Sequence, residues 1–288
     1  MTELVIARTE DELRALAPTG RLLAGGTDLL VQIRAGRDVS RLIDVSNLID
    51  GPPPVVRVDG GVRLSALAPL AVVIEALDGL LPSLAAVAEL FGSMQIRNRA
   101  TIGGNLANAS PAGDTIPVLV AASATAEVCG PAGSRSLPIT ELITGPGRTA
   151  LAPGEWIATV EVPLPAGEEG FRKLGGRRAM AISVVNLAWR WRRGEDGRLH
   201  DVVLAVGAVA PTVIRAKQAE AELEDERPEP AVVGRAVDAI RAEVAPIDDV
   251  RASAWYRREA VGAVLREALA AAGQGDKRMA RGNAWTSA

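Results

Sequence analysis

The chain has 288 residues, of which 48% are hydrophobic and 23% are charged, and its formal net charge is −3. This composition is ordinary for a globular protein, and the length suffices for a large core and more than one domain. The slightly acidic balance gives no indication of a nucleic-acid partner. The longest apolar stretches, such as residues 116–122, are far shorter than a membrane span, and the first predicted strand follows no signal peptide. We therefore expect a cytoplasmic protein without a membrane span.

Two residue types that carry much catalytic chemistry are almost missing. Cys129 is the single cysteine and His200 the single histidine. An iron–sulfur cluster needs about four thiolates, so this chain cannot hold one, and a zinc site is nearly excluded. A Ser-His-Asp triad would have to use His200, which we expect to be a solvated residue at a strand end. We expect Cys129 to be an inert, partly buried thiol, and we predict no catalytic residue and no metal ligand in this chain.

The first 50 residues predict alternating strands and helices. Thr9 and Glu12 have the spacing of a capping box at the start of the first helix. Gly25-Gly26-Thr27-Asp28 lies between the second strand and a helix over residues 29–34. The expected strands are residues 4–7, 21–24 and 41–45.

The middle of the chain begins after three prolines with a hairpin signal, Asp59-Gly60-Gly61, between two short strands. A loop is predicted over residues 145–154, where glycine and proline are frequent. The expected strands are residues 55–58, 62–64, 124–128 and 156–162, and the expected helices are residues 69–77, 83–91 and 115–122.

From Phe171 onward the pattern indicates a hairpin followed by helices. Residues 185–192 and 199–209 form the expected strands, with a turn at Glu195-Asp196-Gly197. The expected helices are residues 216–224, 231–244 and 253–272, and the polar residues that follow are expected to fray. We therefore predict an α+β protein with a C-terminal domain of antiparallel sheet plus helices that starts near residue 170.

Two short segments combine glycines with hydrogen-bonding side chains. Gly25-Gly26-Thr27 precedes a predicted helix, and Thr101-Ile102-Gly103-Gly104-Asn105 repeats the combination. Backbone N–H groups in such segments bind anions, and glycine lets phosphate oxygens approach the backbone. An ordinary turn is the alternative for each segment alone. Together they are consistent with two N–H-rich loops that hold a pyrophosphate from opposite sides.

The common phosphate-binding motifs are absent. The chain has no G-x-x-x-x-G-K-[ST] P-loop, and no G-x-G-x-x-G opens a helix as in the Rossmann fingerprint. The residues alone therefore predict a dinucleotide bound in a manner unlike that of the Rossmann fold.

Four stretches, in order, carry a specific resemblance. They are "LLAGGTDLL", "QIRNRATIGGNLANASPAGD", "FRKLGGRRAMAISVVN" and "DDVRASAWYRREA", and they span residues 22–261. The chain resembles the FAD-binding subunits of the molybdenum hydroxylases, a family that includes the medium subunit of carbon monoxide dehydrogenase and the FAD domain of xanthine dehydrogenase. The T-I-G-G-N segment with its N-A-S-P-A-G-D continuation is the most specific of these motifs.

The resemblance implies an FAD-binding domain of the vanillyl-alcohol-oxidase type over residues 1–168, with subdomains of about 1–54 and 55–168. It also implies a C-terminal domain over residues 169–275 and a polar tail over 276–288. In this family the FAD pyrophosphate lies between the two glycine segments. The FAD-binding residues so implied are Leu23, Ala24, Gly25, Gly26, Thr27, Asp28, Leu29, Thr101, Ile102, Gly103, Gly104 and Asn105.

Three further positions carry over by motif. Asp114 matches an acidic residue close to the flavin, although it could equally cap the helix that starts at Thr115. Lys173 matches a lysine at the edge of the isoalloxazine, and a solvated lysine is the alternative. Ile157 or Ala158 matches an aliphatic residue near the ring, and Ile157 is our choice for the contact.

The resemblance also implies partners. The molybdenum cofactor would lie on a large subunit and two [2Fe-2S] clusters on a small subunit, in a heterotrimer or a dimer of heterotrimers. This chain would pass electrons from the clusters through FAD to an external acceptor. The alternatives are a self-contained FAD-dependent oxidoreductase and a non-catalytic nucleotide-binding subunit. The substrate and the acceptor are not indicated by the sequence.

Overall fold

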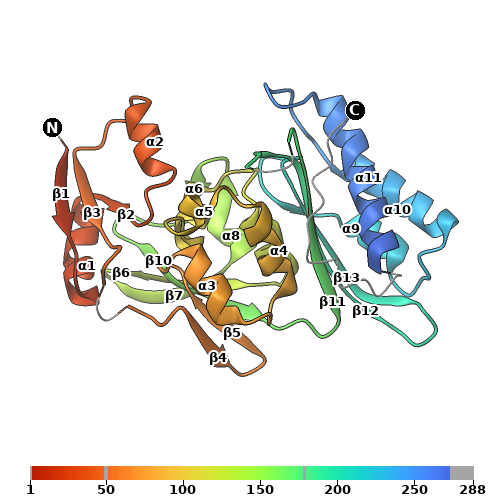
Figure 1. The fold of residues 1–288 in the computed structure, drawn as a ribbon, viewed down its shortest axis with the longest axis horizontal. Helices are drawn as coiled ribbons and strands as arrows, with labels where there is room; N and C mark the ends of the chain where they lie inside the picture. Colours follow the sequence, from red (N-terminus) through yellow and green to blue (C-terminus); the bar gives the residue numbers. More distant parts are fainter. Residues whose placement is uncertain (1, 49–50, 178–179, 273–288) are drawn as a thin grey trace. The chain divides into compact units, whose positions relative to one another are not determined.

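The computed structural model describes residues 2–48, 51–177 and 180–272 (Figure 1). The chain forms two compact units, and each draws on separate parts of the sequence. The predicted single boundary near residue 168 stays a prediction, and the predicted tail lies outside the described residues. Unit 1 comprises Met1–Asp78, Ser93–Ala109 and Ala124–Pro163, and unit 2 comprises Gly79–Gly92, Ser110–Ser123 and Leu164–Ala288.

Unit 1 begins with the predicted alternation of strands and helices. Its three strands form a parallel sheet in the order β1-β3-β2, and parallel pairing requires the helical crossovers between them. Thr9 caps the first helix by accepting the Glu12 N–H at 3.2 Å. The Glu12 carboxylate accepts the Arg8 N–H at 2.7 Å instead of that of Thr9, so the capping box is shifted by one residue. The elements are β1 (Glu3–Ile6), α1 (Glu10–Leu16), η1 (Ala17–Thr19), β2 (Arg21–Leu23), α2 (Leu29–Arg34) and β3 (Arg41–Asp44).

The second sheet of unit 1 is antiparallel, with the order β4-β5-β10-β6-β7. Its strands are β4 (Val55–Val58), β5 (Gly61–Ser65), β6 (Thr125–Gly130), β7 (Gly133–Pro138) and β10 (Trp156–Pro163). The sequence did not predict β7. The loop expected at residues 145–154 is wrong in part, because its first residues belong to a short hairpin of β8 and β9. The remaining elements are α3 (Leu70–Leu77), α5 (Met94–Arg97), α6 (Ile102–Asn108), α8 (Ile139–Leu142), β8 (Ile143–Gly145) and β9 (Arg148–Thr149).

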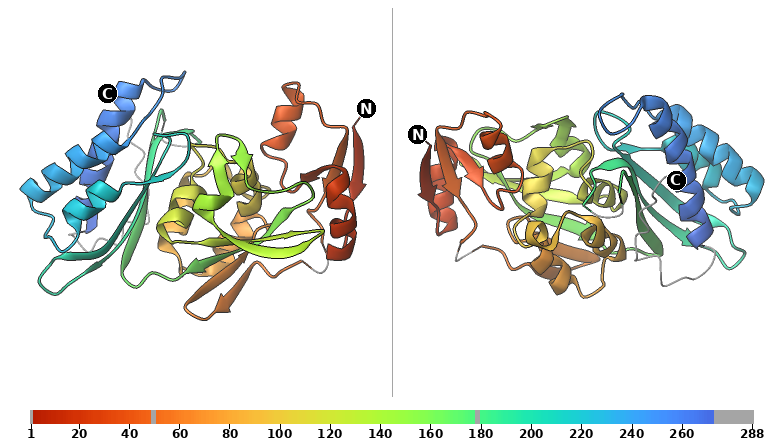
Figure 2. Two further views of the ribbon diagram at one scale, coloured as in Figure 1. Left: turned by 180° about the vertical axis from the view of Figure 1, so that it is seen from behind. Right: turned by 45° about the horizontal axis from the view of Figure 1, so that its top comes forward.

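Unit 2 is an antiparallel sheet in the order β11-β12-β13-β14, with helices on both faces. Helices α9, α10 and α11 cover one face, as Figure 2 shows, and share a hydrophobic core with β12 and β13. Helices α4 and α7 contact the other face. This arrangement confirms the predicted α+β class and the C-terminal sheet with helices. The elements are α4 (Pro82–Leu90), α7 (Thr115–Ala121), β11 (Glu168–Gly175), β12 (Ser183–Arg193), β13 (Leu199–Gly207), β14 (Ile214–Arg215), α9 (Lys217–Leu223), α10 (Pro230–Glu243) and α11 (Ala254–Ala272).

The core of unit 2 contains two stacked tryptophans and a buried arginine. The Trp189 and Trp191 rings lie 5.7 Å apart, and both side chains are buried. Arg257 is 2% exposed, and its guanidinium donates to the carbonyls of Val184 at 2.9 Å and Ala208 at 2.8 Å. These bonds hold the start of α11 against the sheet. In residues 2–48, 51–177 and 180–272, no helix has the length and hydropathy of a membrane span.

Candidate cofactor site

The segment between β2 and α2 in unit 1 presents several unused hydrogen-bond donors. Among the described residues, the backbone N–H groups of Gly25, Gly26, Thr27 and Asp28 donate to no protein acceptor. Gly26 has a φ of +72°, a left-handed conformation that glycine adopts without strain. The next helix begins when the Leu30 N–H bonds to the Gly26 carbonyl at 3.1 Å. Successive N–H groups of this kind form a concavity that binds anions.

The second glycine segment differs from its prediction as a loop. Thr101 is the N-cap of α6, and Gly103, Gly104 and Asn105 lie in the first turn of that helix. The Gly103 N–H donates to the Ala66 carbonyl at 2.8 Å, and the Gly104 N–H donates to Thr101 Oγ1 at 2.9 Å. The Asn105 N–H donates to the Thr101 carbonyl at 3.0 Å. These donors are occupied, so the expectation of a second N–H-rich loop is wrong, and the tight turn that the glycines suggested is a helix start.

The structure nevertheless brings the two segments together. A β-carbon on Gly25 would lie 1.8 Å from the Arg99 carbonyl oxygen, and one on Gly103 would lie 2.7 Å from that of Ala66. These two glycines are therefore required by backbone packing inside unit 1. A β-carbon on Gly104 would meet only Thr101 Oγ1 within 4 Å, at 2.9 Å. Gly104 is also exposed, so its main chain is not covered by backbone in the way that Gly25 and Gly103 are.

The residues present in unit 1 fit an anionic group such as a pyrophosphate. Four adjacent N–H groups lack acceptors, and the Thr27 hydroxyl also has no hydrogen-bond partner among the described residues. Partial loss of hydration raises the pKa of the neighbouring Asp28 carboxyl.

The aliphatic residues predicted at the site differ in exposure. Ile102 is fully buried and Ile157 is 3% exposed, so both side chains belong to the protein core. The pairing of β10 with β6 shifts register between Ile157 and Thr159, which leaves Ala158 as the bulged residue. Ala158 is partly exposed, and its carbonyl accepts the Ala66 N–H at 3.0 Å. A side-chain contact is therefore more accessible from Ala158 than from Ile157.

Unit 2 contains a buried cluster around Asp114. Lys173 Nζ lies 2.5 Å from Asp114 Oδ2, and the two side chains are 6% and 7% exposed. The other carboxylate oxygen, Oδ1, accepts Ser183 Oγ at 2.6 Å and Asn186 Nδ2 at 3.0 Å. Lys173 Nζ also lies 3.5 Å from the carbonyl of Leu90. The structure therefore joins two predicted site residues in one ion pair.

Asp114 occupies the N-cap position of α7, which starts at Thr115 as predicted, but its side chain makes no cap bond because the carboxylate is used by Lys173, Ser183 and Asn186. The alternative of a solvated Lys173 is wrong. Lys173 is buried and paired, not solvated. Ser183 and Asn186 lie in the quoted stretch "FRKLGGRRAMAISVVN" but were not predicted as site residues. Residues three apart on a regular strand face opposite sides, but the pairing of β11 with β12 shifts register between Leu174 and Gly175. Both hydrogen bonds to Asp114 can form because of this irregularity.

A second buried ion pair joins β11, the strand of Lys173, to β12. Arg190 Nη2 is 2.6 Å from Glu169 Oε2, and the Glu169 side chain is 1% exposed. Glu169 Oε1 accepts the Ser83 hydroxyl at 2.7 Å and the Ser83 N–H at 3.0 Å. This pair reproduces the serine–carboxylate–cation pattern with residues that the sequence does not connect to a cofactor.

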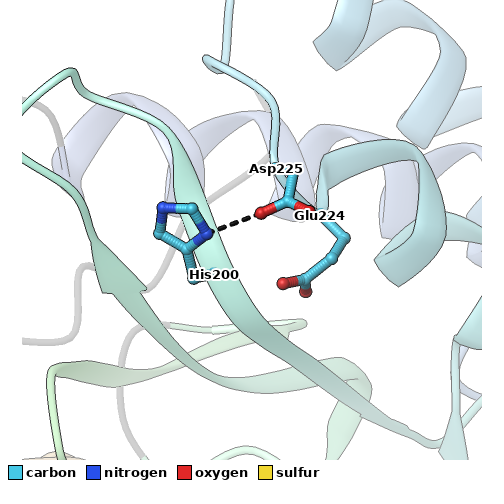
Figure 3. Close-up of side chains that lie close together, drawn as sticks. All are labelled: His200, Glu224 and Asp225. Atoms are coloured by element: carbon cyan, nitrogen blue, oxygen red, sulfur yellow. Dashed lines mark hydrogen bonds and ion pairs between the residues drawn. The ribbon is translucent and has the colours of Figure 1, made fainter.

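His200 lies in a cluster with Glu224 and Asp225 (Figure 3). It is 30% exposed at the start of β13, so it is partly solvated as predicted, but its Nδ1 also pairs with Asp225 Oδ1 at 2.6 Å. Glu224 lies beside them, but its carboxylate accepts the N–H groups of Asp201 and Val202, each at 2.8 Å. The group therefore joins β13 to the end of α9. Cys129 is free and buried, and burial raises the pKa of its thiol, as expected for an inert residue.

Comparison with known proteins assigns the family. The model of the FAD binding domain in molybdopterin dehydrogenase matches residues 3–165, which is more than half of the chain. The chain belongs to this FAD-binding family. The model of the CO dehydrogenase flavoprotein C-terminal domain matches residues 171–272 of the same FAD-binding chain.

Relatives of this FAD-binding chain match it over nearly their whole length. It is 32% identical to the xanthine dehydrogenase FAD-binding subunit of Escherichia coli O157:H7, covering 93% of this chain and 95% of the relative. It is 30% identical to the nicotine 6-hydroxylase medium subunit of Paenarthrobacter nicotinovorans, with 88% and 89% covered. A chain of carbon monoxide dehydrogenase from Hydrogenophaga pseudoflava has the same fold, with a TM-score of 0.88, 28% identity, and 94% and 97% covered. The predicted family and fold are thereby confirmed.

Proposed function

We propose that this chain is the FAD-binding electron-transfer subunit of a molybdenum-containing hydroxylase or dehydrogenase. The observation that carries the proposal is the row of four backbone N–H groups at Gly25–Asp28, which find no acceptor in the part of the chain that the structure describes, within a domain of FAD-binding type. A pyrophosphate supplies the oxygens that such a row lacks. The relatives include FAD-binding and medium subunits of several oxidoreductases.

The proposed division of cofactors follows from the side chains available. The chain has one cysteine and one histidine, so the iron–sulfur clusters of such a complex would have to lie on another subunit. We assign two [2Fe-2S] clusters to a small subunit and the molybdenum cofactor to a large one, in a cytoplasmic heterotrimer or a dimer of heterotrimers. The FAD held by this chain would supply one- and two-electron redox chemistry between the clusters of the partner subunit and an external acceptor.

The residues of the chain would hold and tune the cofactor. Residues 23–29 would bind the pyrophosphate through their free N–H groups. Residues 101–105 would form the opposite wall, where the Thr101 hydroxyl still has its own proton to donate. Ile157 and its neighbour Ala158 would contribute main chain near the ring. Lys173, held by Asp114, would stabilise negative charge on the reduced flavin.

Co-purification with cofactor analysis tests the proposal. The tagged full-length chain, expressed with its genomic neighbours, should bring down two further subunits, FAD, iron and molybdenum. If the chain purified alone, without iron or molybdenum, and still oxidised a substrate, the proposal would be wrong.

A variant pair localises the pyrophosphate. Gly104→Val should abolish FAD retention while leaving the iron content of the complex unchanged. A β-carbon there meets only Thr101 Oγ1 within 4 Å, so the valine side chain would occupy the space proposed for the pyrophosphate. Gly176→Ala is the matched control, since a β-carbon there would meet nothing within 4 Å. Normal FAD content in Gly104→Val would remove the start of α6 from the site.

A further inference from the structure

The buried carboxylate of Asp114 is divided between two kinds of partner. Oδ1 accepts both neutral donors, Ser183 Oγ at 2.6 Å and Asn186 Nδ2 at 3.0 Å. Oδ2 faces Lys173 Nζ at 2.5 Å. Ser183 and Asn186 are fully buried and lie 3.3 Å apart, from Asn186 Nδ2 to Ser183 Oγ. The two neutral donors therefore fix the rotation of the carboxylate, and its rotation fixes where the ammonium lies.

The ammonium of Lys173 keeps unused bonding capacity. An ammonium carries three N–H donors, and the described residues supply only two acceptors, Asp114 Oδ2 and the Leu90 carbonyl at 3.5 Å. The side chain is only 6% exposed, so bulk water is largely excluded from the group. A buried donor without an acceptor is costly. This leftover donor is the feature that points to a ligand.

A buried ion pair is weak evidence for a stabilising role. Removing two charges from water costs several kcal/mol per ion, which their attraction does not reliably recover. Four polar side chains converge here from the start of α7, from β11 and from the irregular start of β12.

We propose that Ser183 and Asn186 are positioning residues for the flavin. By binding Oδ1 of Asp114 they direct Oδ2 to Lys173, and so set the place of the ammonium that the reduced flavin would meet. This inference rests on the proposed function, because it takes FAD as the ligand of the leftover donor. It adds Ser183 and Asn186, which lie in the stretch "FRKLGGRRAMAISVVN" but were not predicted as site residues.

The second ion pair of β11 provides an internal control. Ser83 Oγ donates to the Glu169 carboxylate at 2.7 Å, nearly the same distance as from Ser183 to Asp114. Glu169 pairs with Arg190, a cation that fills the role Lys173 has in the other cluster. Ser83→Ala therefore also removes a serine hydroxyl that donates to a buried carboxylate, but this carboxylate pairs with Arg190 and not with Lys173.

The experiment compares Ser183→Ala, Asn186→Ala and Ser83→Ala in the full-length chain loaded with FAD. Thermal unfolding, the FAD dissociation constant and the midpoint potential of the bound flavin are measured for each. All three variants should lose stability. Only Ser183→Ala and Asn186→Ala should make the potential more negative, because a less firmly held ammonium stabilises the reduced, anionic flavin less. The same two should weaken FAD binding by roughly 2- to 10-fold, the effect of one hydrogen bond.

Ser183→Thr keeps the hydroxyl and should restore the wild-type potential, which a merely structural role would not require. It also keeps the test decisive if Ser183→Ala does not fold, since Asn186→Ala and Ser183→Thr then carry the comparison. Potentials equal to that of the wild type in both alanine variants, with stability losses like that of Ser83→Ala, would overturn the inference. Failure of the wild-type chain to bind FAD would instead refute the proposed function, so the two failures are distinguishable.

Discussion

The α-carbon of Gly25 packs against the carbonyl oxygen of Arg99, so closely that a β-carbon would come within 1.8 Å of that oxygen. This contact joins the segment before α2 to the segment between α5 and α6. The Leu70 N–H donates to the next carbonyl, that of Ala100, at 2.7 Å, which fixes the second segment in turn. The row of free N–H groups is therefore held by backbone packing and not by the flexibility that glycines usually signal.

Gly25→Ala should destabilise unit 1 and reduce FAD retention together. The methyl group must displace backbone, and overpacking of this kind costs about 1–3 kcal/mol or more. Urea unfolding and FAD content of the purified chain measure the two effects. Gly234→Ala is the control, because Gly234 lies in α10 with nothing within 4 Å of its β-position. It should stabilise the protein by about 0.5–1 kcal/mol, the usual gain of alanine over glycine in a helix. A Gly25→Ala protein of wild-type stability would contradict the contact.

Lys173→Met should strongly lower the free energy of unfolding. Most of this loss should come from the broken ion pair with Asp114. Breaking a buried pair by removing one partner costs about 3–5 kcal/mol. Lys173→Met should fall near the low end, at about 3 kcal/mol, because Ser183 and Asn186 still donate to the carboxylate that remains. The free energy of unfolding is measured for Lys173→Met, Asp114→Asn and the double variant. The double variant should lose clearly less than the sum of the single losses. Additive losses would show that the two residues do not interact.

The sequence predicted the elements well where local signals decide them. Most helices and strands lie within a few residues of their expected bounds, because capping residues, glycine turns and apolar periodicity act locally. The first turn of α6 was missed because two glycines in succession indicate a turn, whereas Thr101 caps a helix there. Strand β7 was missed because its residues are nearly all exposed and polar. Its pairing with β6 provides the order that its own residues do not indicate.

The candidate site was predictable only in part, for a different reason. The glycine segments, Asp114 and Lys173 carry recognisable motifs, so their positions could be named from the sequence. Ser183 and Asn186 also lie in one of the quoted stretches, but the sequence does not show that they meet Asp114, because their shared face depends on a register shift between β11 and β12. A glycine is also required at position 25 because the Arg99 carbonyl packs against it, and the sequence cannot show this contact. Long-range contacts of this kind are set by tertiary packing.

Cys129 should report the opening of unit 1. Burial raises the pKa of its thiol, and the nearby charges of Glu127 and Glu10 raise it further, so little thiolate forms at neutral pH. Labelling by a thiol-specific reagent should therefore be slow in the native chain and fast in urea. As the sole cysteine it needs no background substitution. Labelling of the native chain as fast as that of the unfolded chain would show that this end of β6 is open in solution.

Asp249 should make the stability of unit 2 depend on pH in the acid range. The pKa of this carboxyl lies well below its ordinary value of 3.8. The causes are hydrogen bonds from the side chain and the backbone N–H of Arg251, and the positive charge of Arg257. A carboxyl whose pKa is depressed on folding adds stability above its unfolded pKa, and that stability is lost as pH falls through the folded value. The wild-type chain should therefore lose stability progressively below about pH 5. Urea midpoints measured from about pH 7 to about pH 3 test this.

Asp249→Asn should be less stable at neutral pH, because Arg257 is buried and loses its counter-ion. The difference in stability between this variant and the wild type should narrow as the pH falls. Parallel curves for the two proteins would show that Asp249 is not the group responsible.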